Sequence, residues 1–282
     1  MIRRSIVKSF VTVIIFSLIT AGMTSCALFS SMTKKESLSY ANDRPLFVGV
    51  YQGLNTERTA TVFNGFDVLR DEYSGYFHFK AKNAATFGLT YSLCRCTIKV
   101  TTEREENGKT KIIVRASEPK LQNSRTKNFE DYSLNLVHIE NEVTKAIFAV
   151  MNESDIEFEA KLDKTISNLD FIHSVCIGMN AIAFKQWIEK VRITEREVRF
   201  TMPLYELSES KEKGYKYTIV GVFTPEQEKK YGYHAEDMFV QFETNNDDYI
   251  KYRKGENITL KGKIKSIKQN PFGSGYTIEM TE

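Results

Sequence analysis

YIKYRKGENITLKGKI, residues 249–264, is the stretch that decides the fold of the second half of the chain. A Lys-Gly-acid turn at 254–256 leads into a segment in which apolar and polar residues alternate up to Ile264. Such alternation is typical of a strand with one buried face. Gly262 fits a bend, because a strand that curves around a small barrel needs a residue without a side chain there. The stretch therefore predicts a curved strand in a closed sheet.

Four more strand-like segments surround this one. The five expected strands cover residues 197–207, 215–223, 238–243, 258–267 and 276–280. Polar turns separate them, and five strands of this length can close a small barrel. The passage at 249–264 resembles the third-to-fourth-strand passage of OB-fold domains, which implies an OB-like β-barrel over residues 193–282. OB-fold families often bind oligonucleotides, oligosaccharides or protein loops on one face.

Basic and aromatic side chains gather in the predicted barrel, a mixture that single-strand-binding grooves use. The possible ligand face consists of Lys251, Tyr252, Lys261, Lys263, Lys265 and Tyr276. The three lysines at 261, 263 and 265 also follow the period of two expected for the wet face of any half-buried strand. A solvated strand face is therefore favoured over a groove. A protein or glycan partner is the next interpretation, and a nucleic acid partner is not expected.

Residues 45–165 predict a second folded unit with the order β-α-β-β-β-α, which makes the whole chain an α+β protein. Its expected elements are a strand at 46–51, a helix from Asn55 or Thr56 to Leu69, strands at 76–80, 89–101 and 109–116, and a helix at 136–150. The first helix rests on the spacing of Val62, Phe63 and Phe66. Asn107-Gly108 predicts a hairpin between the last two strands.

A helical connector is expected at residues 166–192. Within it His173 and Cys176 stand three residues apart, so that a base and a nucleophile could share one helical face. Their apolar neighbours favour burial instead. A hydrolase that uses Asp237, Asp247 and Asp248 is the competing enzymatic hypothesis, although Asp247 and Asp248 are more simply explained as turn residues.

The cysteines and the charge balance predict neither a metal site nor a cofactor. Cys94 and Cys96 have no nearby Cys or His pair to complete a tetrahedral set, so ordinary buried thiols are favoured, for Cys176 as well. The chain has 39 basic and 36 acidic residues, and its first 25 residues contain three of the bases and none of the acids. The remainder is neutral overall, which argues against strong non-specific attraction to nucleic acid.

The amino-terminal segment reads as a secretory signal. A basic start with Arg3, Arg4 and Lys8 is followed by an apolar run and then by small residues. The sequence Met23-Thr-Ser-Cys26 resembles the lipobox of bacterial lipoproteins. That resemblance implies a signal peptide at 1–25, a diacylglycerol on Cys26 and a flexible tether at 26–44. Ala27 after the cysteine favours the outer membrane over retention in the inner one.

The expected function is that of a non-enzymatic binding or scaffold module, tethered to the membrane of the bacterial envelope through Cys26. Envelope proteins or glycans are the expected partners. The alternatives are an envelope hydrolase with an unrecognised site and a surface protein that binds oligonucleotides or glycans through its OB-like barrel.

Overall fold

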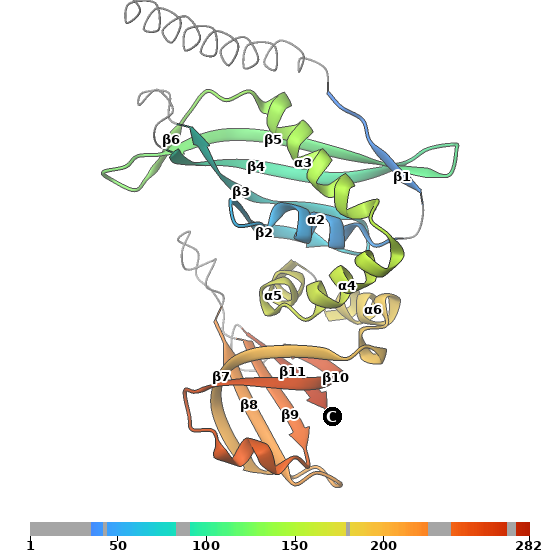
Figure 1. The fold of residues 1–282 in the computed structure, drawn as a ribbon, viewed down its shortest axis with the longest axis vertical. Helices are drawn as coiled ribbons and strands as arrows, with labels where there is room; N and C mark the ends of the chain where they lie inside the picture. Colours follow the sequence, from blue (N-terminus) through green and yellow to red (C-terminus); the bar gives the residue numbers. More distant parts are fainter. Residues whose placement is uncertain (1–34, 42–43, 83–90, 179–180, 225–237, 270–274) are drawn as a thin grey trace, which may run out of the picture.

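The computed structural model describes residues 35–41, 44–82, 91–178, 181–224, 238–269 and 275–282. It contains a six-stranded sheet, a layer of helices and a five-stranded barrel, in that order along its longest axis (Figure 1). The chain is thus of the mixed α+β class, as the sequence predicts. The signal peptide, Cys26 and most of the tether lie outside the described residues.

The sheet is antiparallel throughout, with the order β1-β5-β4-β3-β2, and β6 pairs with β5. Its strands are β1 (Ser39–Ala41), β2 (Thr59–Asp67), β3 (Glu72–Lys82), β4 (Tyr91–Arg104), β5 (Lys109–Gln122) and β6 (Phe129–Asp131). The hairpin predicted at Asn107-Gly108 joins β4 and β5. Gly108 has a φ of 78°, a left-handed conformation that favours glycine.

The first two predicted elements of this unit were exchanged, and both errors have a physical cause. Residues expected as a strand form helix α2 (Leu46–Leu54), which is buried on nearly every side and so shows no helical period. Residues expected as a helix form β2. A β-bulge between Phe63 and Gly65 lets Phe63 and Phe66 face the same core, and this spacing of three imitates a helix.

The folded unit begins earlier than the predicted tether allows. The backbone N–H of Ile112 donates to the carbonyl of Leu38 at 3.0 Å, next to the pairing of β1 with β5. The backbone N–H of Glu36 donates to Oδ1 of Asn141 at 2.8 Å, and the Glu36 carboxylate pairs with Lys145 at 2.9 Å. Residues from Lys35 onward therefore belong to the sheet unit rather than to a flexible tether.

Helices cover one face of the sheet and then connect it to the barrel (Figure 1). They are α3 (Leu136–Met151), α4 (Asp155–Ile166), α5 (Leu169–Gly178) and α6 (Ala181–Val191). Helices α2 and α3 pack on the sheet and against each other, so closely that a Cβ on Gly53 would lie 2.7 Å from the carbonyl oxygen of Ala146. The rings of Phe47, Phe171 and Trp187 meet in the core between α2, α5 and α6. The helical connector expected at 166–192 is formed by α5 and α6.

The five strands predicted in the second half all form, and their pairing closes into a barrel with the order β10-β11-β9-β8-β7. They are β7 (Val198–Glu209), β8 (Tyr217–Phe223), β9 (Met238–Thr244), β10 (Asn257–Gln269) and β11 (Tyr276–Thr281), with short 3-10 helices η2 (Ile193–Glu195) and η3 (Asp247–Lys251). Strands β9 and β11 are parallel and the other pairs antiparallel.

Gly262 is the bend that its position predicts. Strand β10 pairs with β7 as far as Gly262 and with β11 from Lys263 onward. A Cβ on Gly262 would lie 2.1 Å from the carbonyl oxygen of Thr281 and 2.9 Å from Cε2 of Phe242. The absence of a side chain is therefore what lets one strand belong to both sides of the barrel.

Candidate functional site

The residues of the predicted ligand face come from several elements. Lys251 ends η3 and Tyr252 follows it, whereas the lysines at 261, 263 and 265 lie on β10. Tyr276 begins β11, and its hydroxyl donates to the backbone carbonyl of Cys176 at 2.9 Å. Tyr276 thus contributes to the contact between the barrel and α5.

Most lysines of this predicted face have acidic partners on the protein. Lys261 pairs with Glu197 at 2.7 Å, Lys265 pairs with Glu212, and Lys251 lies 3.7 Å from Asp248. Exposed pairs of this kind contribute little to stability, but each places a negative charge beside the positive one. Lys263 has no ion pair within the described residues. The strand lysines point away from the buried Leu260 and Ile264, as the predicted alternation requires.

On the outer surface of β8, β9, β11 and β10, the side chains form a more regular arrangement than the lysines at 261, 263 and 265 do. Residues in register across these four strands point outward in three rows. The rows are Thr218, Glu243, Thr281 and Lys263; Val220, Gln241, Glu279 and Ser266; and Val222, Phe239, Thr277 and Lys268.

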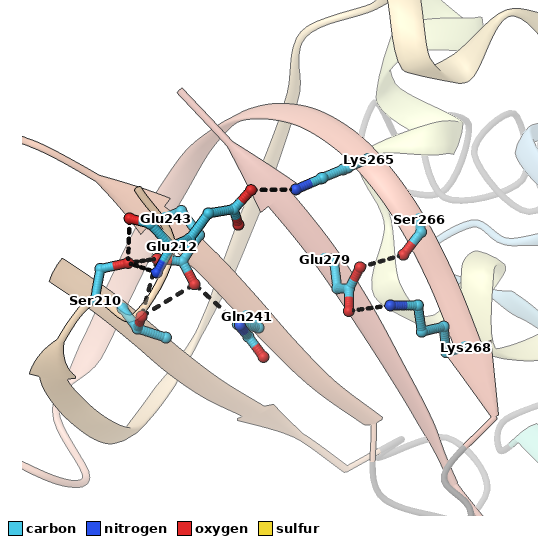
Figure 2. A network of polar contacts seen from close by, with 9 residues as sticks. Ser210, Glu212, Gln241, Glu243, Lys265, Ser266, Lys268 and Glu279 are labelled. Carbon is cyan, nitrogen blue, oxygen red and sulfur yellow. Dashed lines mark hydrogen bonds and ion pairs between the residues drawn. The ribbon is translucent and has the colours of Figure 1, made fainter. Parts of the chain in front are cut away.

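Glu243 is the centre of the first polar network on this surface (Figure 2). Its carboxylate is only 4 % exposed and accepts hydrogen bonds from Oγ of Ser210 at 2.7 Å, Oγ1 of Thr218 at 2.9 Å and Nε2 of Gln241 at 2.9 Å. A buried carboxylate needs such donors to replace water. Because Ser210 follows β7, the network fastens the β7–β8 loop onto β9, and the pair of Lys265 with Glu212 ties the same loop to β10.

Glu279 is the centre of a second network, in which it accepts hydrogen bonds from Ser266 and Lys268 (Figure 2). Partial burial raises the pKa of Glu279, yet the hydrogen bonds from Lys268 and Ser266 outweigh burial and leave this pKa below its ordinary value. The lysines of this region therefore hold strands and loops together. Sequence reasoning identified neither carboxylate, since most of their partners come from other strands or from a loop.

One corner of the barrel surface presents aromatic rings to solvent. Tyr205 is 44 % exposed, and its ring meets that of Phe239 edge-on with centroids 5.7 Å apart. The ammonium group of Lys254 lies 4.4 Å from the Tyr205 ring centroid. Val222 is the register partner of Phe239 on β8. We call these four residues the aromatic corner: it offers ring faces and one cation, which together suit a ring-bearing ligand.

Sequence reasoning missed Tyr205 for a local reason. Strand β7 alternates strictly between buried and exposed residues as far as Leu204, and Tyr205 and Glu206 are then both exposed. The pairing of β7 with β8 is irregular between Leu204 and Glu206, so Tyr205 occupies a bulge. Two consecutive outward residues inside an alternating strand are the signal that could have identified it.

The thiols lie in the core, as their apolar surroundings predict. Cys94, Cys96 and Cys176 are all buried, and burial raises the pKa of Cys96 to about 12 and raises that of Cys176 further. His173 and Cys176 do share α5, but both side chains are at most 2 % exposed. Because reactive cysteines need an accessible thiolate, this pair is not arranged for nucleophilic catalysis.

Two of the three acids of the hydrolase hypothesis lie in the described part of the chain, and each has a basic partner nearby. Asp247 accepts a hydrogen bond from the Tyr217 hydroxyl at 2.9 Å and lies 3.4 Å from the Lys216 ammonium group, and these contacts lower the pKa of Asp247. Asp248 pairs with Lys251. Asp237 lies outside the described residues.

Comparisons with family models, with curated proteins and with solved structures found no match for this chain. In the part of the chain that the structure describes, His, Cys, Asp and Glu side chains form no group of three that could hold a metal ion. No helix within those same residues is long and apolar enough to cross a membrane.

Proposed function

We propose that this chain is a lipid-anchored, non-enzymatic binding protein of the bacterial envelope, held by Cys26 at the outer membrane. Support for the anchor comes from the basic start, the apolar run and the lipobox-like sequence that ends at Cys26. Several acyl chains would make such an anchor durable, since each buried methylene contributes about 0.8 kcal/mol.

The barrel, in this proposal, is of the OB type. Support comes from its five strands, its Greek-key order and the curved strand that Gly262 allows. Strands β8 and β9 are then the second and third strands, whose outer face carries ligands in OB folds. Both strands contribute to the aromatic corner, through Val222 and Phe239.

The aromatic corner is the observation that carries the binding function, and we assign it a glycan of the envelope. The exposed ring of Tyr205 can pack on the apolar face of a sugar ring, and the neighbouring Lys254 and Gln241 can donate hydrogen bonds to hydroxyl groups. The ordered networks of Glu243 and Glu279 hold this surface rigid, which lowers the entropic cost of binding.

Co-sedimentation with insoluble cell-wall glycan tests the assignment. We expect the protein to pellet with the glycan and Tyr205→Ala to lose about 1 to 3 kcal/mol of binding, as stacked rings do. Tyr132→Ala is the matched control, since Tyr132 is similarly exposed, at 37 %, but follows β6 on the distant sheet. Equal pelleting of Tyr205→Ala and wild type would refute the role of the corner. A wild-type protein that stays in solution would refute the glycan.

The anchor needs a separate test in cells. Cys26→Ala should release the protein from the membrane fraction after a high-salt wash, while the wild type remains. A Cys26→Ala protein that still pellets with membranes would contradict the anchor without affecting the barrel proposal.

A further inference from the structure

A cavity of about 440 Å³ lies where the sheet meets α4, α6 and η2, away from the aromatic corner of the barrel. The residues that line it carry more positive than negative charges. Five cations line it, from four parts of the chain, against two acids, Asp71 and Glu159. The cations are Arg44, Arg104, Lys190, Arg192 and Arg196.

Two of these cations are already held by protein groups. The guanidinium of Arg44 donates to the carbonyls of Met151 at 3.0 Å and Glu153 at 2.7 Å, and it also pairs with Asp155. Arg196 bridges Glu159 at 3.0 Å and Asp163 at 2.7 Å, which also accounts for one of the two lining acids. These two arginines therefore act as structural members of the wall.

The other three cations have weak partners or none. Arg104 ends β4 and Lys190 lies on α6, and neither has an ion pair within the described residues. Arg192 approaches only Glu195, three residues away and at 3.9 Å, with both side chains largely exposed. Positive charge thus remains in the cavity after its internal pairs are formed.

Asp71 is the other acid that lines the cavity, and its carboxyl group has a hydrogen-bond partner on the protein. The Tyr73 hydroxyl donates to it at 3.0 Å, and burial raises the pKa of Asp71 above its ordinary value. Asp71 has a φ of 52°, a left-handed conformation that Asp adopts more readily than most non-glycine residues. Lys190 and Arg104 act on the pKa of Asp71 in the opposite direction, so Asp71 does face these cations, but one carboxylate cannot balance three of them.

Part of the cavity lining is apolar. Phe47, Leu162 and Trp187 line it, and all three are buried. The indole N–H of Trp187 is buried without a hydrogen-bond partner in the described structure. This N–H has no accessible surface, so a ligand would contact the apolar part of the lining rather than this donor.

We propose that this cavity binds a small organic anion, with its anionic group between Arg104, Lys190 and Arg192 and its apolar body toward Trp187. The volume falls within the range of small-molecule sites. The cations supply charge-assisted hydrogen bonds that a carboxylate or a phosphate can accept. The site is independent of the barrel surface and of the anchor.

Trp187 provides a direct assay because it is the chain's single tryptophan. The full-length protein, purified in detergent, is titrated with phenylacetate and phenyl phosphate, and with neutral 2-phenylethanol as the charge control. Tryptophan emission and calorimetry are both recorded. We expect saturable binding of one or both anions, the tighter one identifying the anionic group, and at least tenfold weaker binding of the alcohol, since about 1.4 kcal/mol separates each decade.

Substitutions locate the binding. Lys190→Gln and Arg104→Gln should each raise the dissociation constant of the tighter anion about tenfold. Lys185→Gln is the matched control, because Lys185 is exposed on the same helix as Lys190 but does not line the cavity. Equal thermal unfolding of the variants excludes misfolding. The proposal is overturned if neither anion binds, if 2-phenylethanol binds as tightly, or if the two cavity variants bind like wild type.

Discussion

Replacing Gly262 by alanine should destabilise the barrel by about 3 kcal/mol. The added Cβ would lie 2.1 Å from the Thr281 carbonyl oxygen, more than 1 Å inside ordinary contact, and no rotamer can move it. The strands must separate locally, at a cost of about 1 to 3 kcal/mol for overpacking and about 1 kcal/mol for each ladder hydrogen bond lost between β10 and β11. Alanine also lowers the conformational entropy of the unfolded chain, and this stabilises the fold by less than about 1 kcal/mol.

Urea unfolding followed by circular dichroism measures this loss, on the chain without residues 1–26. Lys263→Ala is the control, since Lys263 is the next residue of β10 and is exposed. We expect the control to remain within about 0.5 kcal/mol of wild type. A Gly262→Ala protein equally close to wild type would refute the reasoning, because a barrel that tolerates this Cβ cannot have β10 and β11 as close as the structure places them.

Three further predictions concern the barrel surface. Glu243→Ala should cost about 2 kcal/mol in urea unfolding, because three hydrogen-bond donors lose their acceptor; an unchanged midpoint would show that water replaces the carboxylate. The lowered pKa of Glu279 means that its ionised form stabilises the fold above the ordinary value of 4.5, and this contribution is lost as pH falls through the folded-state pKa. Thermal unfolding of Glu279→Gln should therefore change less with pH in that acid range than wild type, and parallel curves would contradict this. Replacing Lys261, Lys263 and Lys265 together by Gln should leave the fold and the capture of envelope partners unchanged, and a salt-sensitive loss of a captured polymer would restore the groove interpretation.

The barrel could be predicted from sequence because each of its strands has one buried face. Strand β7 shows this most clearly, with buried Val198, Phe200, Met202 and Leu204 alternating with exposed residues. The period of two is then visible without knowledge of the partners. Tyr205, at the irregular position of β7, is the residue that sequence reasoning overlooked. A period of two therefore predicts strands, but it does not predict a bulge within a strand.

The sheet unit was harder because burial on all sides removes the period. Helix α2 buries seven of its nine residues between the sheet and the other helices, so its composition resembles that of a central strand. His78 on β3 is likewise covered: it is 1 % exposed and packs against the ring of Phe129 on β6. In both cases segments distant in the sequence, invisible in a local window, cover the residues in question.

The charge of the chain illustrates the same point for the candidate sites. Without its first 25 residues the chain carries equal numbers of acidic and basic residues, so composition predicts no preference for anions. Folding then distributes these charges unevenly. On the barrel, the lysines that look like a cationic stripe in sequence mostly find acids from neighbouring strands or loops. At the junction of sheet and helices, Arg104 and Lys190 converge from positions 86 residues apart. The two acids that line the same cavity are the partly buried Asp71 and Glu159, and Glu159 is paired with Arg196. A cationic site can therefore arise where the sequence shows no cluster, while an evident cluster is neutralised.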